Sequence, residues 1–381
     1  MNPENIRSEG PFVALLAAAS AIEQRRPEAL VAAFQSVSPQ AMLQVAARHR
    51  CLGYLRQGIV ELGVRDERVS AFTKSVREYA GKAAIQAYAV RDQLRQLVHL
   101  LNEAKMQFAL LKGSARLFRG DPTADYDTMF DLDILVPRED AVAAVHALER
   151  GGYSSRASGD RSRHYWARHH HGVPLQPANA GLPIEVHVQL APLGSLSLAT
   201  DWPACQKYFE RVATAHGEAT CFDAIGSAFH LAVHGLGMRR LHDVFLFARV
   251  LRSDNRVLEI IDVTISQEHN QAVALQAVIA LGARVAGLTY TESPAVKRYL
   301  SWVMHRENLV PYVRDRSQFA DAWFCNGCTV WGPATRQALP LREAEQNSVS
   351  FAASFAYRLI GRIATSAYAL ASVATVPVRR L

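Results

Sequence analysis

The stretch that decides the fold is Phe130-Asp-Leu-Asp-Ile-Leu-Val136. Apolar and acidic residues alternate along it, and successive side chains of a strand point to opposite faces of a sheet. We therefore expect Asp131 and Asp133 on one face of a strand that ends at Pro137. Taken alone, an Asp-x-Asp pair also fits the solvated face of an edge strand, and this alternative stays open.

Two further extended segments lie on either side of this strand in the sequence. Phe108-Ala-Leu-Leu111 is a short apolar run ending at Lys112-Gly113-Ser114, which predicts a buried strand followed by a turn. The run from Leu182 to Leu190 alternates again and places Glu185 and His187 together on its polar face. Acidic residues on the polar faces of neighbouring strands are the feature that the chemistry below depends on.

Helical patterns surround these strands. Between Val69 and Lys105 apolar residues recur every three or four positions, and Glu139 to Gly152 is a shorter helical pattern with a glycine stop. From Ala204 onward the sequence again favours helices. We expect an α+β fold with a small mixed sheet between two helical regions. The expected division is a helical region 1–105, a catalytic core 106–200 and a helical region 201–381.

The composition excludes several classes of protein. With 49% hydrophobic and 20% charged residues among 381, the chain is neither disordered nor fibrous. The formal charge of +7 permits an anionic partner without requiring one. Met1 to Gly10 lacks the apolar core of a signal peptide, and the uncharged run from Ile363 to Val378 is shorter than the ~20 residues of a spanning helix. Five scattered cysteines suggest no disulfide scaffold, so we expect a reducing, cytoplasmic setting.

The three carboxylates of Asp131, Asp133 and Glu185 are the centre of the predicted chemistry. Like charges repel when they converge, so their proximity is costly unless a cation lies between them. Mg²⁺ or Mn²⁺ prefers such oxygen ligands, and Mg²⁺ also bridges substrate phosphates. Upstream, the glycine turn at Gly113-Ser114 can present backbone N–H groups and a hydroxyl to a phosphate.

The order of these motifs resembles a poorly characterised bacterial nucleotidyltransferase family of the polymerase-β-like superfamily. The resemblance runs roughly from Phe108 to Leu251. It includes a Gly-Gly-Tyr corner at Gly151-Gly-Tyr153 and a helical segment with His230, His234 and Leu241-His-Asp243. Its three principal motifs are Leu110-Leu-Lys-Gly-Ser-Ala115, Asp131-Leu-Asp-Ile-Leu-Val136 and Ile184-Glu-Val-His187.

The resemblance implies a reaction and the residues that carry it. A nucleoside monophosphate would pass from a nucleoside triphosphate to an acceptor hydroxyl with release of pyrophosphate. Asp131 and Asp133 would bind two divalent ions, and Glu185 would complete the site. The acceptor is left open as a small molecule, a peptide or RNA.

The resemblance also implies a binding segment for the triphosphate. Gly113 and Ser114 would hold its β- and γ-phosphates, and Lys112 would contact the triphosphate or the leaving pyrophosphate. Relatives often carry an arginine four residues before the first aspartate, where this chain has Asp127. Arg116 and Arg119 are candidates to compensate for it.

Two alternative functions stay open, and the acid at position 127 is a hint of the first. One is a nucleotide-binding or regulatory protein that retains the fold without turnover. The other is a kinase-like phosphotransfer to a peptide with the same metal ions.

Two histidine-containing segments have more than one interpretation. The densest basic and aromatic stretch, Arg161-Ser-Arg-His-Tyr-Trp-Ala-Arg-His-His-His171, either lines the nucleotide or acceptor cleft or forms an exposed loop. His187 either orients Glu185, contacts substrate, or packs as a hydrogen-bonded histidine.

Other residues favour structural roles. His230 and His234 have a spacing that can chelate zinc, but they lack the H-E-x-x-H signature, so packing is favoured. Asp243 is expected to cap or salt-bridge helices behind the site. Cys325-Asn-Gly-Cys328 has no second cysteine pair, which favours free thiols. The stretch 351–381 favours a helix closing the core over a peripheral contact with an acidic membrane or partner.

Overall fold

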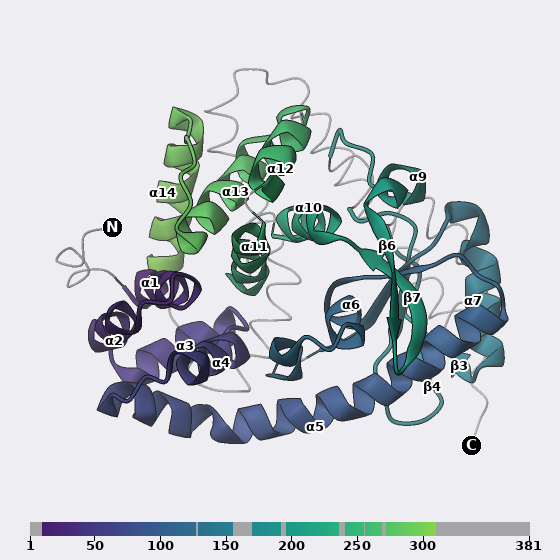
Figure 1. Cartoon of the computed structure of the whole chain (residues 1–381), viewed down its shortest axis with the longest axis horizontal. Helices are drawn as coiled ribbons and strands as arrows, with labels where there is room; N and C mark the ends of the chain where they lie inside the picture. The colour runs from purple at the N-terminus through teal and green to yellow at the C-terminus, as the bar shows by residue number, and fades with distance from the viewer. Residues whose placement is uncertain are drawn as a thin grey trace, which may run out of the picture.

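The structure is a computed structural model in which helices surround a small sheet (Figure 1). The α+β class with a small mixed sheet is confirmed. The residues that the structure describes are 10–126, 129–154, 170–191, 196–235, 241–254, 256–268 and 272–309.

The main sheet has five strands in the order β5-β2-β1-β7-β6. Their pairing is mixed, because β1 is antiparallel to β2 and parallel to β7, while β2 is parallel to β5 and β6 is antiparallel to β7. The two strands that carry predicted acids, β2 and β5, therefore lie beside each other within one sheet. The bounds are β1 Ala109–Leu110, β2 Leu132–Leu135, β5 Ile184–His187, β6 Phe209–Thr214 and β7 Gly217–Phe222.

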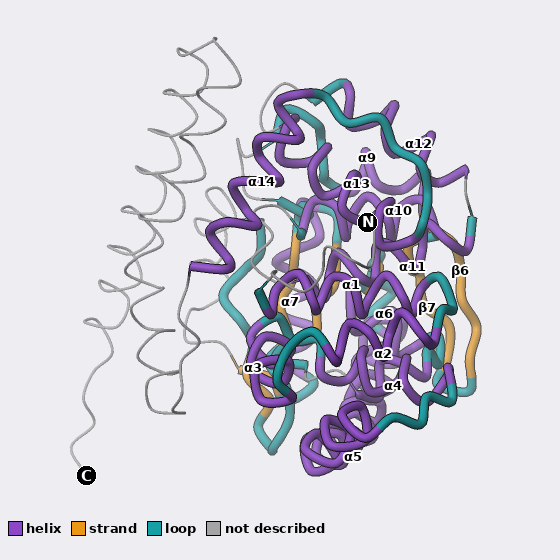
Figure 2. The backbone as a smooth tube through the Cα atoms, turned by 90° about the vertical axis from the view of Figure 1, so that its left-hand side faces the viewer, coloured by secondary structure: helices purple, strands orange, loops and turns teal. Residues whose placement is uncertain are grey.

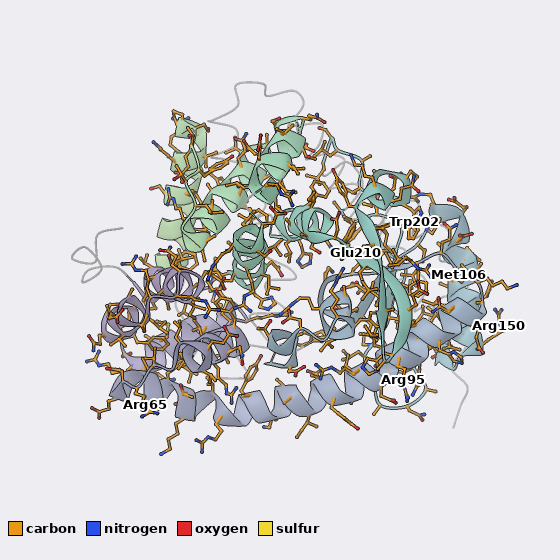
Figure 3. The ribbon with its side chains drawn as sticks, in the orientation of Figure 1. Arg65, Arg95, Met106, Arg150, Trp202 and Glu210 are labelled. Atoms are coloured by element: carbon orange, nitrogen blue, oxygen red, sulfur yellow. The ribbon has the colours of Figure 1, made fainter. Side chains whose placement is uncertain are left out.

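The hairpin of β6 and β7 corrects the expectation that helices resume at Ala204. Its six paired positions run from Phe209↔Phe222 to Thr214↔Gly217, and Gly217 takes the positive φ of +112° that the turn requires. Trp202 of the short helix α9 (Trp202–Cys205) stacks on Phe209 at the outer strand, next to Glu210 (Figure 3). The sheet thus includes residues beyond the expected core limit of 200.

One hydrophobic core covers one side of the sheet. The long helix α5 (Glu67–Glu103) begins at Asp66, whose carboxylate accepts the backbone N–H groups of Arg68 and Val69. It runs along the lower edge of Figure 1 from the N-terminal helices to the sheet. Its buried residues from Ala87 to Leu101 pack with strand residues into one cluster.

Smaller elements complete this sheet region. Helix α6 follows β1, α7 follows β2, and a separate antiparallel pair, β3–β4, lies beyond α7. Their bounds are α6 Lys112–Phe118, η2 Pro122–Tyr126, η3 Arg138–Asp140, α7 Ala141–Arg150, β3 Tyr153–Ser154 and β4 Gln176–Pro177.

The N-terminal and C-terminal helices share the other hydrophobic core. Buried residues of α1, α10, α11 and α13 belong to one cluster, and α1 packs directly against α13. Figure 2 shows these helices grouped above α5. The bounds are α1 Pro11–Glu23, α2 Pro27–Gln35, α3 Pro39–Arg48, α4 Leu52–Leu62, η4 Gln206–Tyr208, α10 Ala224–His234, α11 Leu241–Ser253, α12 Arg256–Ser266, α13 Ala272–Ala286 and α14 Pro294–Leu309.

A buried ion cluster joins three of these helices. Glu23 at the end of α1 is 3% exposed, accepts a hydrogen bond from the Tyr54 hydroxyl at 2.7 Å, and lies 3.1 Å from an Arg249 guanidinium nitrogen. Close packing of α1 on α4 also requires Gly58, where a Cβ would come within 2.5 Å of Ile22. The division into three domains stays a prediction, but the two helical regions pack on each other.

Two sequence features have simple structural counterparts. Cys51, Cys205 and Cys221 are buried, and none of them is part of a disulfide among the described residues. Among the described residues, no helix is both long and apolar enough to cross a membrane. The cytoplasmic setting stays a prediction.

Candidate functional site

The parallel pairing of β2 with β5 brings the predicted acids together. Asp133 is directly in register with Glu185, and two residues on Leu135 is in register with His187. Because the side-chain period of a strand is two, Asp133, Glu185 and His187 project from the same face. One ligand atom of each lies within 4.8 Å of the others.

Asp133 is the buried centre of the group. Its strand lies inside the sheet between β5 and β1, and the residue is 3% exposed. Its Oδ1 accepts a hydrogen bond from His187 Nε2 at 2.7 Å, and its Oδ2 lies 3.1 Å from Lys112 Nζ. The alternative of a solvated edge strand is therefore wrong for Asp133.

The charges around Asp133 reinforce one another. Burial alone would raise the pKa of Asp133, but the Lys112 ammonium and the His187 hydrogen bond outweigh it and hold that pKa well below its ordinary value. Burial would likewise lower the pKa of Lys112, but Asp133 and Asp131 outweigh it and raise that pKa. Asp133 is therefore an anion paired with a cation.

Asp131 precedes β2 and is partly buried. Burial is the main cause, and the negative charge of Asp133 the second, that raises the pKa of Asp131 to about 6. Without a further cation, the Asp131 carboxylate therefore takes up a proton more readily than an ordinary aspartate does. A raised pKa beside other acidic groups is the property expected of a carboxylate at a cation-binding site.

Glu185 lies on the edge strand β5 and is the more accessible acid, with 19% of its side chain exposed. Its Oε2 lies 3.6 Å from His187 Nε2 and 4.0 Å from His171 Nδ1. Burial alone would raise the pKa of Glu185, but His187 and His171 outweigh it and lower that pKa. Burial also lowers the pKa of His171. Glu185 is therefore a carboxylate between imidazoles.

Three imidazoles gather at this end of β5. The ring centres of His170 and His171 lie 5.4 and 5.3 Å from that of His187. Burial alone would lower the pKa of His187, but its hydrogen bonds to Asp133 and Glu185 outweigh it and raise that pKa. Alternation along the strand had placed His187 beside Glu185; its contact with Asp133 depends on strand pairing and was not predicted.

The donor set fits a divalent cation. Two carboxylates and one imidazole converge, and imidazole and carboxylate together suit first-row metals such as Mn²⁺ as well as harder ions. His187 Nδ1 is buried and has no hydrogen-bond partner in the described part of the chain, so the ring retains unused coordination capacity. The convergent group thus contains two of the three predicted acids, Asp133 and Glu185, and adds the imidazole of His187, while Asp131 is not part of it.

The segment expected to bind phosphate begins helix α6. Leu111 precedes the helix and donates its N–H to the carbonyl of Asp133 at 3.1 Å. Ser114 is 1% exposed, and its hydroxyl oxygen accepts the backbone N–H of Asp133 at 3.1 Å. A Cβ at Gly113 would come within 2.9 Å of the Met129 side chain. Ser114 therefore holds β2 in place, and Gly113 allows close approach to the segment before Asp131.

The two histidines of α10 have different surroundings. His234 Nδ1 lies 2.9 Å from an Asp243 oxygen, which confirms the expected link between helices, and this charge outweighs burial to hold the pKa of Asp243 well below normal. His230 is 4% exposed, and burial, followed by the charge of Lys112, lowers its pKa well below the usual value. The contact of His234 with Asp243 and the burial of His230 favour structural roles for both histidines.

Arg116 and Arg119 are engaged with the protein. Arg116 Nε donates to Asp121 at 2.8 Å, and Arg119 contacts the hairpin at Phe222 O and Glu210. Their predicted compensation for an arginine at position 127 has no support from these contacts. Several features of the sequence lie outside the described residues. These are Asp127, positions 161–169 of the basic stretch, Cys325, Cys328 and the segment 351–381.

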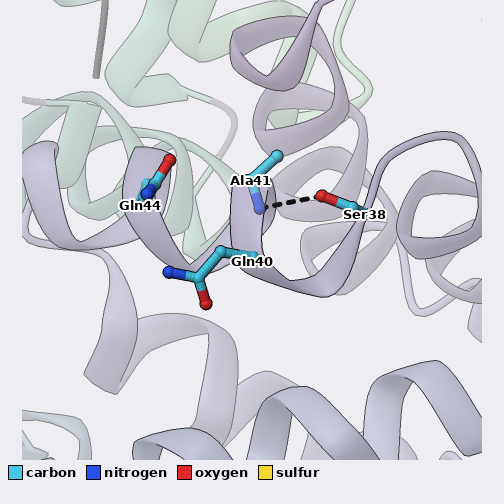
Figure 4. Close-up of a pocket in the computed structure, with 4 residues that line it drawn as sticks. All are labelled: Ser38, Gln40, Ala41 and Gln44. Carbon is cyan, nitrogen blue, oxygen red and sulfur yellow. Dashed lines mark hydrogen bonds between the residues drawn. The ribbon is translucent and has the colours of Figure 1, made fainter. Parts of the chain in front are cut away.

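A surface hollow elsewhere has no such chemistry. It encloses about 400 Å³ at the start of α3 and is lined by Ser38, Gln40, Ala41 and Gln44 (Figure 4). The Ser38 hydroxyl accepts the backbone N–H of Ala41 at 3.2 Å and so caps the start of α3. No ionisable side chain lines it, so the acidic cluster remains the candidate site.

Comparison with known proteins identifies a family for this chain. Residues 35–286 match the model of a protein family described as "Uncharacterised nucleotidyltransferase". The match runs from the last residue of α2 to the last residue of α13 and includes every strand of the main sheet. Searches of curated proteins and of solved structures found no match.

Proposed function

The chain belongs to this family of uncharacterised nucleotidyltransferases, and from that premise we propose the reaction that its acidic cluster performs. It transfers a nucleoside monophosphate from a nucleoside triphosphate to an acceptor hydroxyl and releases pyrophosphate. The observation that supports this proposal is the convergence of Asp133, Glu185 and His187 beside Asp131. The acceptor is a small molecule, a peptide or RNA.

We assign the metal-binding role to Asp131, Asp133 and Glu185, with Mg²⁺ or Mn²⁺ as the ion. When bound, such ions stabilise the entering and leaving oxygens of an in-line displacement at phosphorus. His187 fixes the orientation of Asp133 through the 2.7 Å hydrogen bond. The polymerase-β-like arrangement of the site stays part of this proposal.

The triphosphate is assigned to the start of α6. Amide groups in the first turn of a helix have no intrahelical acceptor, so those of Gly113 and Ser114 suit phosphate oxygens. Because the Ser114 hydroxyl oxygen already accepts the Asp133 amide, the contribution of Ser114 is its backbone N–H. Lys112 supplies the positive charge for the phosphates or the leaving pyrophosphate.

Labelled triphosphates test the reaction. The protein is incubated with each α-labelled or γ-labelled nucleoside triphosphate, Mg²⁺ or Mn²⁺, and a cell extract as the source of acceptors. Transfer of the α label supports the proposal, while transfer of the γ label supports the kinase-like alternative. Nucleotide binding without transfer supports a protein that has lost turnover, and absence of both nucleotide and metal binding contradicts all three.

Isosteric variants connect the activity to the site. Asp131→Asn, Asp133→Asn and Glu185→Gln are each expected to lower transfer by about 100-fold or more, because each removes a charge that holds the metal. Asp92→Asn is the matched control, since Asp92 lies on α5 with half of its side chain exposed. Unchanged transfer in the three site variants would contradict the assignment.

A further inference from the structure

Lys112 lies inside the acidic cluster rather than at its rim. Its ammonium nitrogen is 3.1 Å from Asp133 Oδ2, and only 25% of its side chain is exposed. The other oxygen of Asp133 accepts the hydrogen bond from His187. Each oxygen of this buried carboxylate thus already has a partner within the protein, and an entering cation competes with the positive charge of Lys112 for it.

His187 is poorly placed to leave. Its side chain is 3% exposed, its backbone is paired within β5, and the rings of His170 and His171 pack against it. Moving this imidazole would require the strand or the neighbouring rings to move with it.

Lys112 is well placed to leave. It carries a flexible four-carbon stem, it lies next to the chain bend at β1–α6, and part of its side chain already reaches solvent. Its backbone φ is +46°, a left-handed conformation that is unfavourable for a residue with a Cβ.

We propose that the Lys112 ammonium occupies a cation position of the acidic cluster in the metal-free protein, and that an entering divalent ion displaces it toward the triphosphate. The inference rests on the proposed function and deepens it. One lysine then serves two successive roles, first as a counter-ion of Asp133 and then as a phosphate ligand. Metal binding and triphosphate binding are coupled, because the first event releases the group that the second uses.

Amine labelling with and without metal tests the displacement directly. Wild-type protein is treated with N-hydroxysuccinimidyl acetate, and acetylation of each lysine is followed by mass spectrometry with and without Mn²⁺. Lys105 is the internal control, because it is exposed and has a similar left-handed backbone, with φ of +55°. We expect Mn²⁺ to accelerate acetylation of Lys112 by about tenfold and to leave that of Lys105 unchanged, since the ammonium loses its buried ion pair.

The outcomes separate this inference from the function. If Mn²⁺ binds, as measured by the electron paramagnetic resonance signal of the free ion, and Lys112 labelling does not change, the inference is wrong and the proposed function stands. If Mn²⁺ does not bind to the wild-type protein, the proposed function and the inference both fail.

A variant provides a second measurement. In Lys112→Met, the competing charge is gone, so Mn²⁺ measured without nucleotide is expected to bind about tenfold more tightly. Triphosphate binding in the presence of Mn²⁺ is expected to weaken by a similar factor. Lys105→Met should change neither affinity. Weaker Mn²⁺ binding by a folded Lys112→Met protein would overturn the displacement.

Discussion

Asp133 is held from three directions by its neighbours. His187 and Lys112 contact its two carboxylate oxygens, and the Ser114 hydroxyl accepts its backbone N–H. A carboxylate fixed in this way has little rotational freedom, which favours a single orientation toward a metal ion. The orientation of the Asp133 carboxylate thus depends on residues from β5 and α6.

His187 is expected to act on the metal through Asp133. In His187→Gln, the hydrogen bond to Asp133 is weakened and Mn²⁺ affinity should fall by about 10-fold to 100-fold, as for other groups that orient metal ligands. The affinity is measured by Mn²⁺ titration, together with kcat and KM of the transfer reaction. We expect the loss to appear in the metal affinity and in kcat rather than in KM for the triphosphate.

A matched control separates orientation from general destabilisation. His146 on α7 has half of its side chain exposed, and His146→Gln should leave Mn²⁺ binding unchanged. A folded His187→Gln protein with wild-type Mn²⁺ affinity would show that His187 serves packing alone.

At the scale of elements, regular hydrophobic periodicity was the most reliable signal. The apolar stripe that runs from Val69 to Lys105 corresponds to most of α5. The hairpin was missed because Phe209–Thr214 has an irregular mixture of exposed and partly buried positions. The signal that was present is Gly217 at the start of the second six-residue strand, a turn glycine that the helical interpretation of this region overlooked.

The site was predictable as a set of residues but not as a set of contacts. Alternation placed Asp131 with Asp133 and Glu185 with His187, because each pair belongs to one segment. The register that aligns Asp133 with Glu185 depends on pairing between residues 52 positions apart in the sequence, and no local pattern encodes it. The entry of Lys112 into the cluster likewise depends on the bend between β1 and α6.

Helix α10 should make the stability of the protein sensitive to acid. The pKa of His230 is lowered by burial, so below about pH 6.5 the unfolded chain binds a proton that the folded chain does not. Stability is therefore lost as the pH falls through that value, by up to about 1.4 kcal/mol per pH unit. Urea unfolding of the wild type and His230→Leu between pH 7.5 and 5.5 measures the contribution.

The free energy of unfolding of His230→Leu should depend less steeply on pH, because up to one fewer proton is taken up on unfolding. His216→Leu, in the turn between β6 and β7, is the comparison variant. Identical slopes for the wild type and His230→Leu would contradict a buried neutral imidazole.

At the scale of the whole molecule, two hydrophobic cores divide the chain differently from its sequence order. One joins the N-terminal helices with α10–α14, and the other joins the second half of α5 with the sheet. Because α5 contributes to both, with Phe72 in the first and Leu97 in the second, it connects the helical body to the candidate site. The linear order of segments alone cannot show which of them share a core.

Hydrogen exchange can test this division. Leu15→Ala in α1 creates a cavity in the helical core and should cost about 2–5 kcal/mol, so amides of α1 and α13 should lose protection together. Leu97→Ala in α5 should instead lower the protection of the β2 and β5 amides against hydrogen exchange. Mass spectrometry of peptides from the four elements measures both. Loss of protection in α1 without α13 would show that the N-terminal helices form an independent unit.

The central position of β1 has a consequence for synthesis of the protein. Ala109 pairs with Leu135 on one side and with Thr220 on the other, so the two neighbours of this strand leave the ribosome at different times. At typical translation rates the delay is roughly ten seconds. During that interval one edge of β1 has no partner, and an open strand edge is a template for pairing with another chain. The nascent protein is therefore most vulnerable to aggregation after β2 and β5 have been made and before the hairpin closes the sheet.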